Sequence, residues 1–292
     1  MKNLNAVLIL GALAREGELR YTPSGTAVLD LTVAGERTVT GADGKDRTIP
    51  FYENVQALGK TAEAIAERGY TAGTVLLVQG QLDYSQWTDD QGVKRSMLRT
   101  RLTGVCREVA GEAQLVQDGG GNQRLAGGLN QVEVTGNLAA DAELRYTPAG
   151  DAVLELRLGV NEKYKDRQNQ MQEKTHWVTV TLWREQAERA ADLKKGDAVY
   201  VQGALVDDTW TDRDGNKRRS KKVEASLCVP LARSGNGNGN ARPAREPVAA
   251  AQPARAAART TLQAAPAPQR SGGLDIDQGL DDFPPEERDL PF

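Results

Sequence analysis

The sequence predicts an all-β protein with two tandem five-stranded barrels, one short helix in each barrel domain, and a disordered C-terminal tail. Three observations lead to this prediction. The six residues Glu18–Pro23 recur unchanged as Glu143–Pro148. Apolar and polar residues alternate along most of both copies, as in strands with one buried face. From residue 232 to residue 270 the chain is rich in Ala, Pro, Gly and Arg, and it has too few apolar residues to form a core.

The repeated hexapeptide lies inside a much longer internal match. The two copies align at an offset of 125 residues, which becomes 123 after a two-residue gap in the second copy. A match of this length is a duplicated domain rather than a short solenoid repeat. We therefore expect a first domain at residues 1–110, a Gly-rich linker at 111–128 and a second domain at 129–231, in agreement with the two domains that 292 residues allow.

The first strand is expected at residues 4–13. A basic residue, an apolar run and an Ala-Leu-Ala sequence make this stretch similar to a secretory signal. Its counterpart at residues 129–138 lies in the middle of the chain, where no leader is cleaved, so we expect a strand and a cytosolic protein. No apolar run approaches the ~18 residues that a membrane-spanning helix requires.

The remaining elements follow in the same order in both copies. Second strands are expected at 29–33 and 154–158, where Leu and Val alternate with polar residues, and third strands at 52–58 and 177–183. A helix follows at 60–68 and 184–193, then fourth strands at 75–82 and 198–206 and fifth strands at 96–106 and 221–229. This element order is that of the OB-fold, a small Greek-key barrel. A split α/β sandwich is the alternative.

A polar hairpin joins the fourth and fifth strands in each copy. It contains Trp87 followed by Lys94 and Arg95 in the first copy, and Trp210 followed by Lys217, Arg218 and Arg219 in the second. Tryptophan among Thr and Asp is an unusual core residue, whereas an exposed ring beside cations suits base stacking and phosphate contact. The alternative is an indole folded back on its own hairpin.

The composition argues against catalysis and metal binding. His176 is the single histidine, and Cys106 and Cys228 occupy non-equivalent positions without a C-x-x-C pair, which suggests buried thiols in a reduced protein. No P-loop, catalytic triad or metal-ligand spacing is present, so we expect no enzyme activity, no cofactor and no metal. The net charge of −3 is unevenly distributed: residues 232–270 carry six arginines and one glutamate, and residues 271–292 carry seven acids and one arginine.

The end of the chain has the pattern of a docking peptide. Residues 232–270 are expected to be a disordered linker and residues 271–292 an acidic tail in which Phe283, Leu290 and Phe292 are set among acids. A segment of acidic and apolar residues at the end of a flexible linker can bind a partner pocket that has a hydrophobic slot and a basic rim. A merely solubilising tail would not need a terminal phenylalanine.

The chain resembles the bacterial single-stranded DNA-binding protein family. The start of each repeat resembles the L-N-x-V-x-x-x-G start of that family. The matching residues are Leu4-Asn5-Ala6-Val7 with Gly11, and Leu129-Asn130-Gln131-Val132 with Gly136. The hairpins at 87–92 and 210–215 resemble its W-T-D-x-x-G motif. The last four residues, Asp289, Leu290, Pro291 and Phe292, resemble its acidic C-terminal tip and are the expected partner-docking residues. The resemblance covers both repeats and the tail.

The resemblance implies roles for individual residues. Trp177, Trp183, Trp210 and Trp87 match family positions that stack on bases. The first copy has Tyr52 opposite Trp177 and Leu58 opposite Trp183, so weaker stacking is expected there. Tyr21 and Tyr146 are expected to pack inward under the first turn. The expected phosphate contacts are Lys217, Arg218, Arg219, Lys94, Arg95, Arg20 and Arg145.

The resemblance also implies partners. Family members with one barrel per chain assemble as tetramers, so two barrels per chain predict a homodimer that contains four. The expected ligand is single-stranded DNA, bound without sequence preference during replication, recombination and repair. Replication and repair proteins are the expected partners of the tip. An OB-fold enzyme and an RNA-binding or primosomal protein of the same fold are the alternatives, and competition between poly(dT) and matched RNA separates the latter from our prediction.

Overall fold

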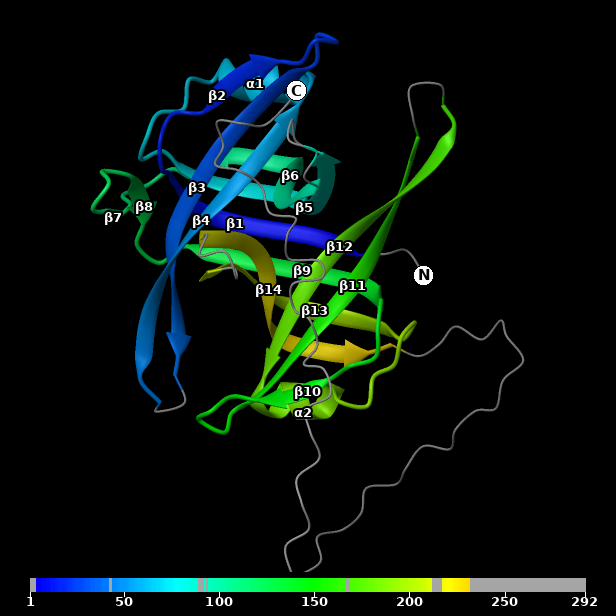
Figure 1. Cartoon of the computed structure of the whole chain (residues 1–292). Helices are drawn as coiled ribbons and strands as arrows, with labels where there is room; N and C mark the ends of the chain where they lie inside the picture. Colours follow the sequence, from blue (N-terminus) through cyan, green and yellow to red (C-terminus); the bar gives the residue numbers. More distant parts are fainter. Residues whose placement is uncertain are drawn as a thin grey trace, which may run out of the picture.

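The computed structural model describes residues 4–41, 44–88, 92, 94–165, 169–211 and 217–231; the predicted tail at 232–292 lies outside them. The side chains of Lys94, Trp210, Lys217 and Arg218 are also outside the description. The elements, in chain order (Figure 1), are β1 (Asn5–Leu13), β2 (Glu18–Tyr21), β3 (Ala27–Thr40), β4 (Asp46–Leu58), α1 (Lys60–Ala66), β5 (Val75–Thr88), β6 (Lys94–Glu108), β7 (Leu115–Gln117), β8 (Gln123–Leu125), β9 (Leu129–Leu138), β10 (Leu144–Tyr146), β11 (Ala152–Lys165), β12 (Met171–Trp183), α2 (Arg184–Ala190), β13 (Ala198–Thr211) and β14 (Lys217–Pro230).

Each repeat closes into a five-stranded barrel. In the first, β1 pairs with β3 and β5, β3 with β4, and β5 with β6, all antiparallel. The parallel pairing of β4 with β6, at Val55 and Thr100, completes the ring. In the second, β9, β11, β12, β14 and β13 repeat this circuit, with the parallel contact at Val180 and Val223. One helix lies between the third and fourth barrel strands of each repeat, as the OB-fold prediction requires.

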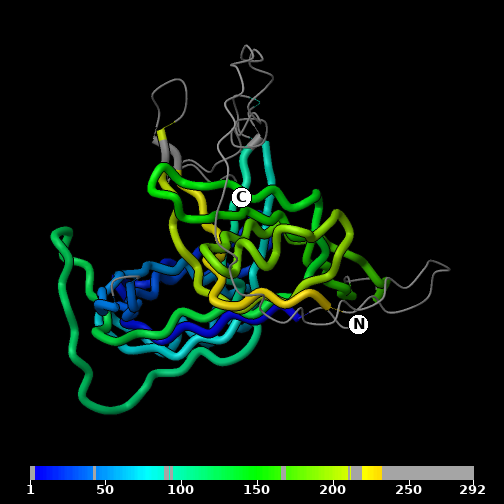
Figure 2. The backbone as a smooth tube through the Cα atoms, turned by 90° about the horizontal axis from the view of Figure 1, so that it is seen from below, coloured from blue at the N-terminus to red at the C-terminus, as the bar shows by residue number. Residues whose placement is uncertain are grey.

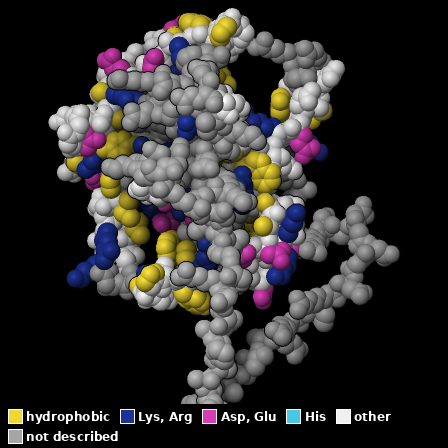
Figure 3. Space-filling view, viewed as in Figure 1, with side chains coloured by type: hydrophobic (Ala, Val, Ile, Leu, Met, Phe, Trp, Pro, Cys, Tyr) yellow, Lys and Arg dark blue, Asp and Glu magenta, His cyan; other side chains and the backbone are white. Residues whose placement is uncertain are grey.

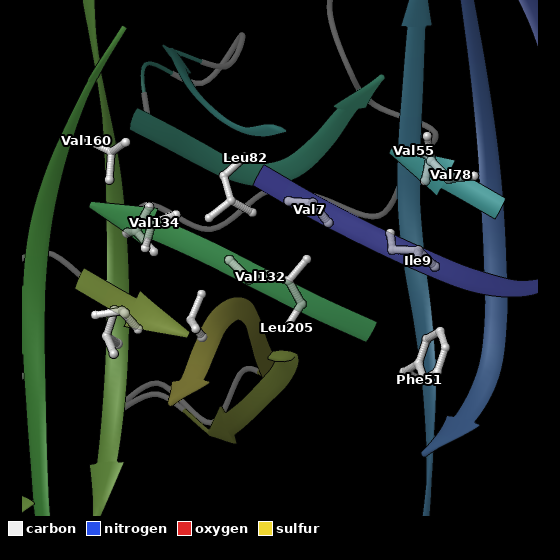
Figure 4. Close-up of a cluster of buried hydrophobic side chains, with 14 of the residues drawn as sticks. Val7, Ile9, Phe51, Val55, Val78, Leu82, Val132, Val134, Val160 and Leu205 are labelled. Carbon is white, nitrogen blue, oxygen red and sulfur yellow. The ribbon is translucent and has the colours of Figure 1, made fainter. Parts of the chain in front are cut away.

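The two barrels share one continuous sheet. Strand β1 pairs antiparallel with β9 over six residue pairs from Asn5 to Leu10. Val7 lies opposite Val132, its own counterpart in the repeat, so a local two-fold axis passes between these residues (Figure 4). Both side chains are buried, with 1% and 0% exposed, and they belong to a core that runs through both barrels.

Two equivalent asparagines fix the position of β1 and β9 in their barrels. The side chain of Asn5 accepts from the Leu82 N–H at 2.8 Å and donates to the Leu82 carbonyl at 2.9 Å. Asn130 makes the same two bonds with Leu205, at 3.0 and 2.9 Å. An amide can pair with both groups of one peptide position, which explains the repeated Leu-Asn opening in physical terms.

The backbone irregularities also repeat. The ladders between the fourth and fifth barrel strands shift register at Gly80 and at Gly203. A Cβ at these positions would stand 2.4 Å from the Arg101 carbonyl oxygen and 2.2 Å from that of Glu224. Only glycine allows so close an approach, which accounts for Gly in both Val-Gln-Gly sequences.

Three features differ from the sequence expectations. The barrel strands are longer than predicted: β3 with β4 and β11 with β12 form long hairpins, which extend well beyond the barrels (Figure 1). The repeated hexapeptide forms edge strands β2 and β10, on which Tyr21 and Tyr146 are 58% and 62% exposed, so the inward packing predicted for these tyrosines is wrong. The connection at 111–128 contains a hairpin, β7–β8, which Figure 2 shows at the periphery of the molecule.

Candidate nucleic-acid interface

Trp177 presents an open aromatic face on β12. Its side chain is 37% exposed, and it lies across the ladder from Gly159 of β11. A Cβ on Gly159 would stand 3.4 Å from the indole ring, so the missing side chain gives the ring room to lie flat on the sheet. The guanidinium carbon of Arg157 is 5.4 Å from the ring centroid, within cation–π range. The arrangement is a rigid stacking surface with a cation beside it.

The equivalent position in the first repeat is occupied differently. Tyr52 is half-buried, and its hydroxyl donates to Asp118 Oδ2 at 2.7 Å and accepts from Arg124 at 3.3 Å. Asp118 and Arg124 belong to the β7–β8 hairpin, and Arg124 is also paired with Glu36 at 2.7 Å. Burial and the Asp118 hydrogen bond raise the pKa of Tyr52. The connecting hairpin therefore holds the aromatic ring of the first repeat, whereas that of the second is open.

Trp183 lies in a groove between the two repeats. The groove has a volume of about 720 Å³, and its walls come from the β3–β4 hairpin of the first repeat and from β9, β12, β13 and β14 of the second. Trp183 is 40% exposed, and the counterpart Leu58 is 42% exposed. The basic residues that line the groove with Trp183 are Arg37, Arg47 and Arg184.

The hairpin tryptophans lie on the extended ends of β5 and β13. Trp87 is opposite Arg95, and Trp210 is opposite Arg218, so both hairpins have an aromatic residue across from a basic one. Trp87 is half-buried, and its indole N–H is buried without a hydrogen-bond partner among the described residues. Its ring therefore offers less open surface than that of Trp177.

The predicted phosphate contacts are mostly engaged with acids where their side chains are described. Arg20 forms an ion pair with Asp30, Arg145 is 3.6 Å from Glu143, and Arg219 is 2.7 Å from Asp207. Arg95 is half-buried and already interacts with another group of the protein. Figure 3 shows basic, acidic and hydrophobic side chains interspersed on the face of the molecule that is seen in Figure 1. A phosphate at Arg20, Arg145 or Arg219 would share or displace a carboxylate.

Sequence reasoning did not identify Arg157, Arg37, Arg47 or Arg184. Arg157 lies two residues before Gly159, so both residues are on the same face of β11. The pairing of Gly159 with Trp177 on β12 is needed to show that Arg157 lies beside the indole ring. Arg37 and Arg47 belong to the first repeat but line a groove beside the second. The length of the β3–β4 hairpin, which the alternation pattern underestimated, brings them there.

Among the residues that the structure describes, no cluster of His, Cys, Asp and Glu could hold a metal ion. Within the same residues, no helix is long and apolar enough to cross a membrane. The predicted docking residues Asp289, Leu290, Pro291 and Phe292 lie outside the described part of the chain.

Two joined OB barrels with exposed tryptophans define a protein of the nucleic-acid-binding OB class. The model of the single-strand binding protein family matches residues 4–105 and again residues 129–229. The chain belongs to this family, in a form with two domains per chain.

Known relatives have the same two-domain length. The single-stranded DNA-binding protein of Deinococcus radiodurans is 49% identical over 300 residues, which cover 100% of this chain and 99% of the relative. That of Thermus aquaticus is 40% identical over 291 residues, with the same coverage of both chains. The crystal structure of the wild-type Thermus aquaticus protein matches with a TM-score of 0.63 and 35% identity, covering 82% of this chain and 98% of that one.

Proposed function

We propose that the protein binds single-stranded DNA without sequence preference and that it acts by binding rather than by catalysis. The observation that carries the proposal is the open surface formed by Trp177, Gly159 and Arg157. Every base has a π-face, so an exposed indole on a rigid sheet accepts any base. The relatives are named single-stranded DNA-binding proteins, which supports the same ligand here.

We propose an unequal division of labour between a first domain at 1–110 and a second at 129–231, joined through 111–128. Trp177 and Trp183 are exposed in the second domain, while Tyr52 is held by the connecting hairpin and Leu58 replaces the other indole. The second domain therefore contributes most of the stacking. Trp210 adds to it, and Trp87 contributes less.

The four-barrel assembly of the family would require two of these chains. The pairing of β1 with β9 already joins two barrels within one chain. We propose a homodimer, with twice the 31.5 kDa mass of the chain. Native mass spectrometry at micromolar concentration checks this, and a dominant monomer or a tetramer of chains would contradict it.

The acidic tip supports a second role. Asp289 to Phe292 combine a carboxylate-rich end with Leu and Phe, which suits recruitment of replication, recombination and repair enzymes in the bacterial cytoplasm and nucleoid. The tip is joined to the second barrel through residues 232–270, so it would reach partners at a distance from bound DNA.

Titration with poly(dT), followed by tryptophan fluorescence at two salt concentrations, tests the binding. We expect strong quenching at low salt and a modest loss of affinity at higher salt, because stacking persists while phosphate contacts are screened. A matched RNA competitor should displace poly(dT) poorly. No quenching, or preferential displacement by RNA, would refute the proposal.

A further inference from the structure

The long hairpin of each repeat forms an ion pair with the other repeat. On one side of the local two-fold axis, Arg37 of β3 is 3.0 Å from Glu224 of β14. On the other side, Arg101 of β6 donates to both oxygens of Glu162 of β11, at 2.6 and 2.8 Å. All four side chains are at least partly shielded from solvent, with 19–36% exposed.

These two ion pairs occupy equivalent positions but have opposite polarity. Arg37 pairs in its hairpin with Ile49, and Glu162 pairs with Lys174, at the constant offset of 125 residues. Arg101 lies beside Gln56, and Glu224 beside Thr181, in the parallel contacts that close the two barrels. The local two-fold axis therefore relates Arg37 to Glu162 and Arg101 to Glu224, so both members of the pair are reversed in charge.

A further interdomain ion pair, between Lys221 and Glu53, has no charged counterpart across the axis. Lys221 of β14 is 3.1 Å from Glu53 of β4 and also donates to the Tyr52 carbonyl at 2.8 Å. Glu53 is 1% exposed, and Asn130 of the second repeat donates to it at 3.3 Å. The equivalent positions across the axis are Val178 and Leu98, an apolar pair. At this position, therefore, one half of the interface is polar and the other is apolar.

Pairing of two identical repeats would lose this complementarity. Two first repeats would bring Arg37 against Arg101 and would bury Glu53 against Leu98. Two second repeats would bring Glu162 against Glu224 and would bury Lys221 against Val178. Like charges at short range repel, and an unpartnered charge in a buried site is strongly destabilising.

We propose that these substitutions between the repeats are a pairing code, which makes each first repeat select a second repeat and reject its own kind. Duplication of a barrel that pairs with itself places two equivalent strands, β1 and β9, in one chain. Without a difference between the repeats, either strand would pair with the same strand of another chain and form a mispaired assembly. Opposite charges on the two copies remove that ambiguity, as complementary charges do at other specific interfaces.

The test compares two double variants that have the same net charge as the parent. Arg37→Glu with Glu162→Arg reverses both hairpin charges, so first–second pairing becomes repulsive at both ion pairs. Arg37→Glu with Glu224→Arg reverses one pair as a unit and keeps first–second pairing complementary. A protease site inserted at the exposed turn Gly119–Gly121 allows the folded chain to be cut between the repeats.

The cut proteins are unfolded in urea, refolded and analysed by native mass spectrometry, with gas-phase dissociation of any four-barrel assembly into two-barrel pairs. The three possible pairs differ in mass. We expect nearly all pairs to be first–second in the parent. In the Arg37→Glu, Glu224→Arg control, like pairs also gain complementary Arg–Glu contacts, so first–second pairs should still predominate through Glu53 and Lys221, but by a smaller margin. The Arg37→Glu, Glu162→Arg variant should lose most first–second pairs, to like pairs or to single halves. In the uncut chain, the same variant should have a Tm about 3–6 °C below that of the control.

Two results would overturn the proposal. One is a statistical mixture of pairs in the parent. The other is equal retention of first–second pairs, or equal Tm values in the uncut chains, for the two double variants. The Tm comparison decides the outcome if the cut halves fail to refold.

Discussion

The hydroxyl of Tyr52 donates a 2.7 Å hydrogen bond to the carboxylate of Asp118. This bond joins the third barrel strand of the first repeat to the hairpin that leads into the second repeat. Asp118 also accepts from the side-chain amide of Asn122 at 3.0 Å and from the backbone N–H groups of Asn122 and Gly120 at 2.9 and 2.8 Å. The Asn122 amide, the Tyr52 hydroxyl and these backbone groups hold the pKa of Asp118 well below the ordinary range. The aromatic ring at the first predicted stacking site is thus anchored to the connection between the domains.

Release of this anchor should increase DNA binding by the first repeat. Asp118→Ala removes the acceptor, and we expect poly(dT) affinity to rise by about two- to threefold, since single contacts between exposed charged groups are weak. The pKa of Tyr52 should fall toward its ordinary value. Tyr52→Phe is the matched variant, because it keeps the ring and removes the donor. Unchanged or weaker binding in both variants would mean that the hairpin does not restrict this site.

Loss of the open indole should weaken binding without unfolding the protein. For Trp177→Ala we expect the loss of about 1–3 kcal/mol of stacking free energy, which raises the Kd roughly tenfold. Trp210→Ala should have a similar direction of effect. Tyr146→Ala is the control, because this exposed tyrosine is not a predicted stacking residue. Equal affinity of Trp177→Ala and the control for poly(dT) would contradict the site assignment.

The two barrel asparagines should contribute unequally to stability. Asn130 is buried and donates to Glu53 as well as to Leu205, whereas Asn5 is half-buried. Asn130→Ala should lower the free energy of unfolding by about 2–4 kcal/mol, because it leaves several buried polar groups unpaired. Asn5→Ala should cost about half as much, since the Asn5 side chain is only half-buried in the native structure. Urea denaturation of both variants measures the difference, and equal losses would contradict this explanation.

Stability should decrease in mild acid because of His176. This residue is fully buried; its Nδ1 accepts from the Tyr84 N–H at 3.0 Å, and its Nε2 lies 2.9 Å from Glu162. Burial lowers the pKa of His176, and this effect outweighs the opposite influence of Glu162 and Asp83. The unfolded chain therefore binds a proton at higher pH than the native state does. The neutral, buried His176 therefore stabilises the native state fully above about pH 6.5, and this stabilisation is lost as the pH falls toward the pKa of His176 in the native state.

Urea denaturation at pH 7.5 and pH 5.5 checks this dependence. His176→Phe, which installs the residue type found at the equivalent Phe51, should be less stable at pH 7.5 but should lose less stability on acidification. An identical loss in the parent and the variant would assign the acid sensitivity to other groups.

Deletion of Asp289 to Phe292 should remove partner recruitment but leave DNA binding intact. In the absence of partners the acids could compete weakly with DNA for basic groups, an effect screened at physiological ionic strength, where the Debye length is ~8 Å. Affinity for poly(dT) should therefore be unchanged, or slightly higher at low salt. A pull-down with both forms tests recruitment, and recovery of the same partners by the truncated chain would show that the tip is only a solubilising tail.

The sequence by itself determined the barrels and their number. Local alternation and the position of the helix between the third and fourth strands are short-range signals, and the internal repeat confirms each of them in a second copy. These signals placed β1 and α1 close to their observed positions. It also predicted Trp177 and Trp183 as stacking residues, because the resemblance to the family marks these positions, and the structure leaves both side chains exposed.

Only the tertiary structure decided how the repeats meet and which site residues are open. Pairing of Val7 with Val132, capture of Tyr52 by Asp118 and the reversed ion pairs of Arg37 and Arg101 each join residues far apart in the chain. Local sequence propensities do not encode such contacts, because the contacts depend on how the first barrel is oriented relative to the second. The lengths of the β3–β4 and β11–β12 hairpins were underestimated for the same reason. Their polar ends are stabilised by the neighbouring repeat rather than by their own alternation.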